Sequence, residues 1–241
     1  MRLKHCSHLH AGTILEHAFG DEFRDLVEVL GAIEPPLRES GPFTDTGRPK
    51  KPKRQRVPIT GQHKYLLMPV DHPTLNLQLA TELRMRGWNT QPIATTGLTV
   101  PDTIGPLSLK GDFVKNTVFV EVEFGNVASM FRDFFKFQIA NRSRAGNVAV
   151  LVTGTRQMMK FADQGQATYE TAARLVPYLS IGIQMPIWIV GIEPDDWNPI
   201  KTRYEEMRDV ASANGVDCYD FETAHGAEIE VEVPPESGVQ N

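Results

Sequence analysis

The stretch KGDFVKNTVFVEVEFGN, residues 110–126, combines a β-strand pattern with an unusual set of carboxylates. Valine alternates with phenylalanine or glutamate along it, which predicts a strand because successive side chains of a strand point to opposite faces. The stretch also places Asp112, Glu121 and Glu123 in or beside the apolar run, although strands favour branched and aromatic residues. These three acids therefore call for an explanation.

A two-residue turn at Lys115-Asn116 would fold the stretch into a hairpin. Asp112 would then lie opposite Phe119, with Glu121 as its diagonal neighbour on the same face. Diagonal Cβ atoms are roughly 7–8 Å apart, close enough to share a ligand. A longer turn would change this arrangement.

Clustered carboxylates repel one another, and a hard divalent cation such as Mg²⁺ can neutralise them. Asp112 and Glu121 would hold the metal together with the Val122 carbonyl, and Glu123 would position or deprotonate a water that attacks a phosphodiester. The other interpretation is that the acids form the solvated face of an antiparallel hairpin. The residues alone leave both interpretations open.

The composition is that of an ordinary globular protein. Of 241 residues, 41% are hydrophobic and 23% charged, and no apolar run reaches the roughly 20 residues that span a bilayer. The length favours one domain over residues 1–241. With only two cysteines and no secretory signal at the N-terminus, we expect the reducing cytoplasm. The net charge of −5 argues against a histone-like coat of DNA but not against a local basic groove.

In the second half of the chain, predicted strands alternate with predicted helices, which favours an α/β architecture with a sheet covered on both faces. A basic loop rich in proline and glycine is predicted over about 35–62, and an acidic, partly disordered tail over about 222–241. The predicted helices span residues 13–34, 72–88, 129–146, 167–179 and 202–215, and the further strands span 147–154 and 186–194.

DFVKNTVFVEVEFGN followed by MFRDFFKFQIA resembles the catalytic region of the BglII/BstYI family of Type II restriction endonucleases. In that family an aspartate is followed nine residues later by the first member of Glu-Val-Gln, then by phenylalanine and a short turn. The likeness continues, in order, through CSHLHAGTILE, LMPVDHPTLNLQLATELRMRGW, VAVLVTGTRQMMKFADQGQATYETA and MPIWIVGIEP. It covers roughly residues 5–195.

The resemblance implies a restriction-endonuclease-like, PD-(D/E)XK core, with a central mixed sheet flanked by helices. It implies a homodimer that needs Mg²⁺ but no ATP, and that cuts both strands of a palindrome in double-stranded DNA to leave 5′-phosphates and four-base 5′ overhangs. A cognate DNA methyltransferase is expected in the host, though not as a physical partner. Asp112 and Glu121 match the metal-binding acids. Glu123 departs from the usual Gln, but related BamHI-type enzymes carry Glu-x-Glu, so the general base stays open.

The resemblance also places base readers at Asn126 and at Asp163-Gln164, and implies a site built around GATC. Asn and Gln can bind adenine, and Asp can accept from cytosine. Without the resemblance, Asn126 would be a turn residue and Asp163 a helix cap. The basic run in the predicted loop would contact phosphates, or would simply be solvated; it includes Lys50, Lys51, Lys53, Arg54 and Arg56.

Helix 129–146 is expected to carry its apolar stripe on Phe131, Phe134, Phe135 and Ile139, as residues of the core or of a dimer interface. Two other functions compete with the restriction enzyme. One is a monomeric Mg²⁺ nuclease for repair or nicking on the same core, and the other is a DNA-binding module without catalysis. Discrete cleavage products would favour the restriction enzyme over both.

Overall fold

The computed structural model describes residues 1–39, 54–56, 63–95, 109–162, 167–179 and 182–226. By their contacts, the residues form two compact units, which we describe separately. The first comprises Met1–Pro36, His72–Met159 and Gly165–Asp195, and the second comprises Leu37–Asp71, Lys160–Gln164 and Asp196–Asn241. The single domain expected from the length stays a prediction. No helix in the described ranges is long and apolar enough to cross a membrane.

The first unit is built on a mixed six-stranded sheet in the order β1-β8-β7-β6-β5-β4. The central strands β6, β7 and β8 are parallel, whereas β1 pairs antiparallel with β8, and β5 pairs antiparallel with both β4 and β6. The strands are β1 (Arg2–His8), β4 (Asn89–Thr90), β5 (Phe113–Lys115), β6 (Val118–Val122), β7 (Val148–Gly154) and β8 (Ile187–Glu193). The expected mixed sheet of an α/β fold is confirmed.

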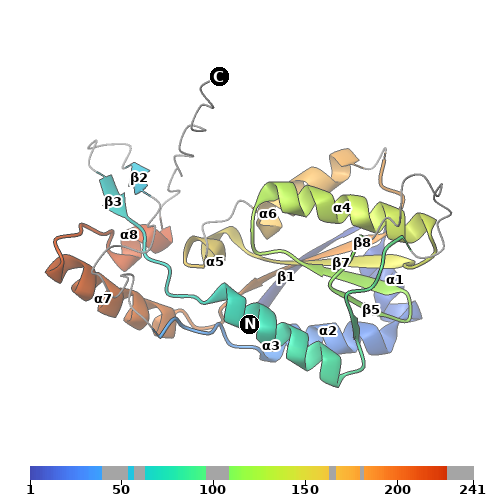
Figure 1. Cartoon of the computed structure of the whole chain (residues 1–241), viewed down its shortest axis with the longest axis horizontal. Helices are drawn as coiled ribbons and strands as arrows, with labels where there is room; N and C mark the ends of the chain where they lie inside the picture. The colour runs from blue at the N-terminus through green and yellow to red at the C-terminus, as the bar shows by residue number, and fades with distance from the viewer. Residues whose placement is uncertain (40–53, 57–62, 96–108, 163–166, 180–181, 227–241) are drawn as a thin grey trace. The chain divides into compact units, whose positions relative to one another are not determined.

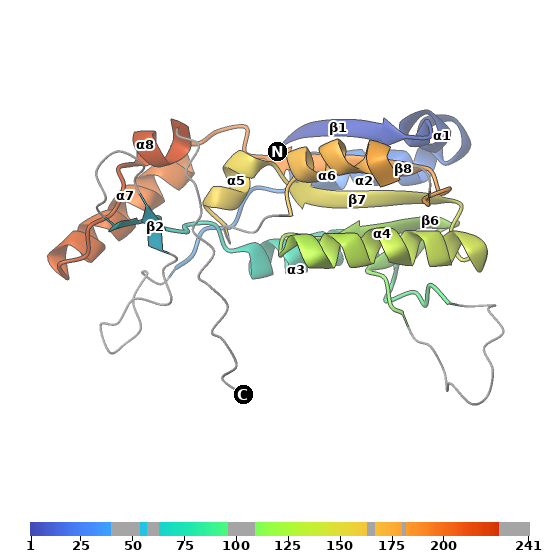
Figure 2. The same ribbon diagram turned by 90° about the horizontal axis from the view of Figure 1, so that it is seen from above.

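Helices cover both faces of this sheet. Figure 1 shows α4 and α6 on one face and α1, α2 and α3 on the other, and Figure 2 shows α4 running beside β6. The helices are α1 (Ala11–Ala18), α2 (Gly20–Ala32), α3 (His72–Met85), α4 (Val127–Arg142), α5 (Arg156–Lys160) and α6 (Tyr169–Leu175), which continues into the 3₁₀ turn η2 (Val176–Leu179). Because the parallel strands are covered on both sides, Val118, Phe119 and Val120 are all fully buried.

The hairpin between β5 and β6 turns one residue later than we predicted. Its last pair is Lys115 with Val118, so the turn residues are Asn116 and Thr117, both with positive φ (45° and 68°). Such a turn matches the twist of the flanking strands, and the Asn116 amide secures it by donating to Glu22 Oε1 at 2.7 Å. The predicted turn at Lys115-Asn116 was therefore wrong.

The corrected turn changes the partner of Asp112. Phe113 pairs with Val120, so the same register continued by one residue brings Asp112 opposite Glu121, not opposite Phe119. Residues directly opposite each other in an antiparallel pair lie on the same face. The two acids of the motif are thus closer neighbours than the sequence analysis assumed.

Other predicted elements are shifted in detail. The expected helix over 13–34 is two helices, α1 and α2, with Phe19 between them in a non-helical conformation. The expected helix over 72–88 ends at Met85, and Gly87 follows its end with φ at +83°, a left-handed conformation that terminates a helix. Strand β1 was not predicted, because its charged and polar side chains hide the pattern of an edge strand.

The apolar stripe of α4 also differs from the prediction. Phe134 is buried as expected, but Phe131 and Phe135 are 41% and 66% exposed. The buried face is formed by Met130, Asp133, Phe134, Lys136, Phe137 and Ala140. Two charged residues therefore lie on the face of α4 that packs against the sheet.

The second unit contains β2 (Arg54–Arg56), which pairs antiparallel with β3 (His63–Tyr65), and the helices α7 (Asn198–Ala213) and α8 (Phe221–Gly226). Strand β2 lies in the segment predicted as a loop, so that prediction was wrong at these residues. Helix α8 covers the first residues of the predicted acidic, partly disordered tail, and the rest of that tail lies outside the described residues. The Phe161 ring packs against Tyr204 and Phe221, with ring centroids 5.7 and 5.3 Å away.

Candidate active site

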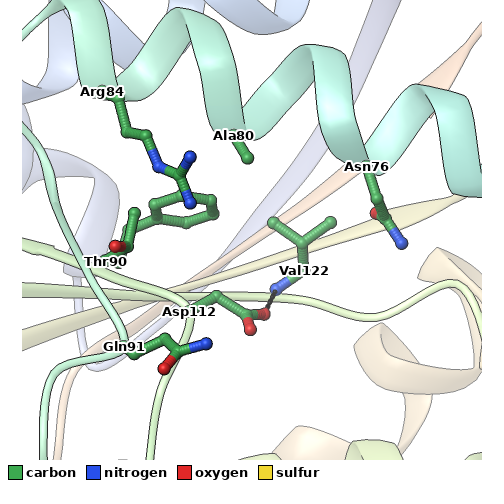
Figure 3. A pocket seen from close by; sticks show the side chains of 8 residues that line it. Asn76, Ala80, Arg84, Thr90, Gln91, Asp112 and Val122 are labelled. Carbon is green, nitrogen blue, oxygen red and sulfur yellow. Dashed lines mark hydrogen bonds between the residues drawn. The ribbon is translucent and has the colours of Figure 1, made fainter.

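Asp112 lies immediately before β5, at the edge of a polar pocket. Its Oδ2 accepts a hydrogen bond from the Val122 backbone N–H at 2.8 Å, which fixes the carboxylate beside the end of β6. The pocket has a volume of about 240 Å³. Figure 3 shows Asp112 and Gln91 on one side of it and Asn76, Ala80 and Arg84 of α3 on the other.

Glu121 is buried in the interior of the first unit. Its side chain is only 2% exposed, because β6 turns it toward α4 on the same face as Phe119. There its Oε2 lies 2.7 Å from Lys136 Nζ, and the same ammonium lies 2.9 Å from Asp133 Oδ1. The interpretation of the acids as the solvated face of a hairpin is therefore wrong for Glu121.

The second oxygen of Glu121 is in a different situation. Oε1 is enclosed and has no hydrogen-bond partner among the residues that the structure describes. Gly111, next to Asp112, passes close to it: a Cβ at Gly111 would lie 3.0 Å from Oε1 and 2.3 Å from Phe119 Cζ. Only glycine fits here without displacing its neighbours. A buried carboxylate oxygen without a donor is uncommon in proteins and marks a place where a cation would be favourable.

Negative charge dominates the buried cluster of Glu121, Asp133 and Lys136. Burial, together with the charges of Asp112 and Asp133, raises the pKa of Glu121 to about 9. Burial likewise raises the pKa of Asp133. The pKa of Lys136 is raised although burial alone would lower it, because the ammonium is hydrogen-bonded to Glu121 and lies beside Asp133. One ammonium is thus shared by two buried carboxylates, with a third acid close by.

Glu123 lies apart from this buried pair. It is half-buried, and its Oε1 accepts a hydrogen bond from the Gly125 N–H at 2.5 Å. Burial raises its pKa. Across the described part of the chain, no group of three or more His, Cys, Asp or Glu side chains is arranged to hold a metal ion. The structure therefore brings Asp112 and Glu121 together, but it does not bring Glu123 onto the same point.

Lys136 and Asp133 are the site residues that the sequence analysis missed. A signal was present, since Asp133 lies three residues after Met130 and Lys136 lies four residues before Ala140, so both share the buried face of the helix. A charged residue on the buried face of an amphipathic helix needs a partner. The helical pattern of α4 could not show which residue of β6 is that partner.

The predicted DNA-reading residues are less fully described. Asn126 is the N-cap of α4: its side chain accepts a hydrogen bond from the Ser129 N–H at 3.0 Å, whereas the alternative interpretation had made it a turn residue. Base reading by Asn126 stays a prediction. Arg54 and Arg56 lie in β2. The side chains of the basic run are outside the described residues, as are Asp163 and Gln164.

The chain matches the model of the family described as restriction endonuclease BglII/BglIII over residues 3–192. It belongs to this family. Among solved structures, it is similar to restriction endonuclease BglII complexed with a DNA 16-mer, with 18% identity, 81% of this chain and 79% of the other covered, and a TM-score of 0.57. Free BglII is matched at 19% identity over 81% of each chain, with a TM-score of 0.49. No curated protein matches.

Family membership makes the chain a Type II site-specific deoxyribonuclease with double-stranded DNA as its partner and a dependence on a divalent metal. The resemblance inferred from the sequence is confirmed, and its extent of roughly residues 5–195 agrees with the matched range. At this level of identity, the likeness to the solved structure supports the fold. The roles of individual residues rest on the geometry described above.

Proposed function

We propose that this enzyme is a homodimer that cuts both strands of a short palindromic DNA site in the presence of Mg²⁺. The proposal includes a site with a GATC core, and 5′-phosphate products with four-base 5′ overhangs. The observation that carries it is the buried Glu121 beside Asp112, with one carboxylate oxygen uncommitted. The BglII structure complexed with a DNA 16-mer supports DNA as the substrate.

The residues present fit a divalent cation with oxygen ligands. Glu121 Oε1 is free of protein donors within the described ranges, Asp112 adds a second carboxylate, and the Val122 carbonyl would add a neutral oxygen. This set suits Mg²⁺, which binds through one or two carboxylates and keeps several waters. When bound, Mg²⁺ supplies Lewis-acid catalysis and lowers the pKa of a coordinated water.

Glu123 is the candidate for the general base or water-positioning group. Its half-buried carboxylate has a raised pKa, and a base works best with a pKa near the operating pH. Gly125 holds one oxygen of this side chain through its N–H, so the carboxylate has a fixed place at the end of β6. In this proposal Glu123 takes a proton from the attacking water, while Asp112 and Glu121 stay ionised.

The proposed dimer would use the aromatic face of α4. Phe131 and Phe135 are exposed there, and with Tyr178 they border an apolar hollow of about 430 Å³. Contiguous exposed apolar surface marks an interaction site. Covering this face with a second copy would pair two cleavage sites, one for each strand. Phe135→Glu should then convert a dimer to a monomer in analytical ultracentrifugation, whereas replacement of the exposed Leu77 on α3 should not.

For recognition, we propose that Asn126, Asp163 and Gln164 contact base edges. The basic run would contact phosphates. Asn126 can read a base through its amide while its oxygen caps α4. The enzyme would act in the cytoplasm of a host that protects its own sites with a cognate methyltransferase.

The test is digestion of plasmid and randomised-library DNA with Mg²⁺, followed by sequencing of the ends. We expect discrete fragments with four-base 5′ overhangs, abolished in Asp112→Ala and Glu121→Ala, while DNA binding in Ca²⁺ survives. Nicked or smeared DNA would favour a monomeric repair or nicking nuclease. Binding without any cleavage by the natural chain would favour a non-catalytic module.

A further inference from the structure

The burial of a lysine ammonium at Lys136 calls for an explanation beyond stability. Lys136 is 6% exposed, and a buried ion pair is often no more stabilising than apolar residues of similar volume. All other positions on this face of α4, apart from Asp133, are apolar. Apolar residues in place of Lys136 and its two carboxylate partners would serve packing equally well, so packing does not explain the charged set as a whole.

The position of Lys136 follows the register of α4 over β6. Phe119 and Glu121, two residues apart on β6, point to the same face of the sheet. Phe119 meets Phe137 edge to face, with ring centroids 6.3 Å apart, and Glu121 meets Lys136 one residue earlier on the helix. The aromatic contact fixes the helix against the strand. Packing of the helix therefore places Lys136 Nζ beside Glu121.

Lys136 contacts only one of the two carboxylate oxygens of Glu121. It donates to Oε2 at 2.7 Å, while Oε1 remains without a donor among the described residues. The charges also remain unbalanced: one ammonium serves Glu121 and Asp133, and Asp112 adds its charge to theirs. When Glu121 is ionised, Lys136 thus balances part of the buried negative charge and leaves the remainder, on the free oxygen, for another cation.

We propose that Lys136 is a positioning residue that holds Glu121 through Oε2 and thereby presents Oε1 as the ligand of the divalent ion. This inference rests on the proposed function, because it assumes that Glu121 binds the metal. Lys136 touches neither DNA nor metal in this role. It acts only through Glu121, as partners of metal-binding carboxylates do elsewhere.

The test measures binding of Mn²⁺ alone, by calorimetry, to the full-length protein and its variants. Removing such a partner typically weakens metal binding by about 10- to 100-fold, so we expect a loss of at least about tenfold in Lys136→Met. The Mg²⁺ concentration for half-maximal plasmid cleavage should rise in parallel, while the rate at saturating Mg²⁺ largely recovers. Lys136→Arg, which keeps a cation able to donate to Oε2, should recover most of the affinity.

The control is Lys115→Met. Lys115 also bonds a carboxylate, Asp25, at 2.8 Å, but on the opposite side of the hairpin from the proposed site, and its replacement should leave Mn²⁺ binding unchanged. A purely structural role for Lys136 would lower the melting temperature of Lys136→Met without moving the Mn²⁺ affinity. Unchanged or tighter Mn²⁺ binding in Lys136→Met would overturn the proposal.

Lys136→Gln provides a second, neutral replacement if Lys136→Met does not fold, and it carries the same expectation. A chain that folds with neither replacement would assign Lys136 to stability alone, which also overturns the proposal. Failure of the proposed function is distinguishable. If the natural chain binds Mn²⁺ no better than Glu121→Gln, the metal is not at Glu121. If Glu121→Gln abolishes binding and Lys136→Met leaves it intact, only the role of Lys136 fails.

Discussion

Asp112 offers a way to separate the structural and the chemical role of one carboxylate. Its Oδ2 accepts from the Val122 N–H at 2.8 Å, and a hydrogen bond to a charged group contributes about 1.5–3 kcal/mol. Asp112→Ala removes the acceptor and should cost about that much stability. Asp112→Asn keeps a neutral acceptor in the same place, so it should cost only about 1 kcal/mol.

The cleavage rates of the two variants should not follow the order of their stabilities. Both substitutions remove the negative charge that would hold the metal, and metal catalysis supplies several kcal/mol of transition-state stabilisation, with tenfold in rate for each 1.36 kcal/mol. We therefore expect both variants to lose about a hundredfold or more in cleavage rate. Unfolding in urea with EDTA measures the stability, and plasmid cleavage at saturating Mg²⁺ measures the rate.

Asp220→Asn is the matched control. Asp220 also accepts a backbone hydrogen bond, from the Thr223 N–H at 2.7 Å, but it precedes α8 in the second unit. Its replacement should lower stability by a similar small amount and leave cleavage unchanged. If Asp112→Asn cleaved at the natural rate, Asp112 would be only an acceptor for Val122, and the assignment of the metal to this carboxylate would be wrong.

Three further predictions concern the same region and the proposed base reader Gln164. The pKa of Glu121 is raised from 4.5 to about 9 in the folded metal-free protein, so the fold favours the protonated acid. The free energy of unfolding should therefore fall by about 1.4 kcal/mol for each pH unit between those values. Urea unfolding with EDTA at a series of pH values measures this fall, which should be less steep in Glu121→Gln. Gly111→Ala places a methyl group against Phe119 and Glu121 and should destabilise the protein by about 1–3 kcal/mol in urea unfolding; an unchanged midpoint would contradict the close packing. Gln164→Ala should reduce discrimination at one base pair by about 1–3 kcal/mol in cleavage of a site library, and an unaltered site preference would remove Gln164 from the readers.

The sheet was largely predictable because its strands have simple local signals. β7 and β8 are continuous apolar runs bounded by turn residues, and the alternation in β6 is clear. The position of the hairpin turn was not predictable in the same way. Asn116 and Thr117 both take positive φ, and threonine, which is β-branched, gives no sign of this preference. The contact of Asn116 with Glu22, 94 residues earlier in the chain, helps to select the turn.

The candidate site was predictable as a set of acids but not as an arrangement. Spacing and resemblance singled out Asp112, Glu121 and Glu123, and the structure places the first two together. Burial of Glu121 depends on α4 covering β6, which no local pattern specifies. Lys136 was overlooked for the same reason, since the nearest strand residue to a helix side chain is decided by tertiary packing.

The engagement of one Glu121 oxygen by Lys136 has a consequence for ion selectivity. A carboxylate with both oxygens available can clasp a large ion such as Ca²⁺, which accepts bidentate ligands in flexible geometries. With Oε2 occupied by the ammonium, Glu121 can offer only a single point of attachment, which suits the small, strictly octahedral Mg²⁺. In the enzyme that we propose, discrimination between the two ions would thus originate in a helix that never touches either of them.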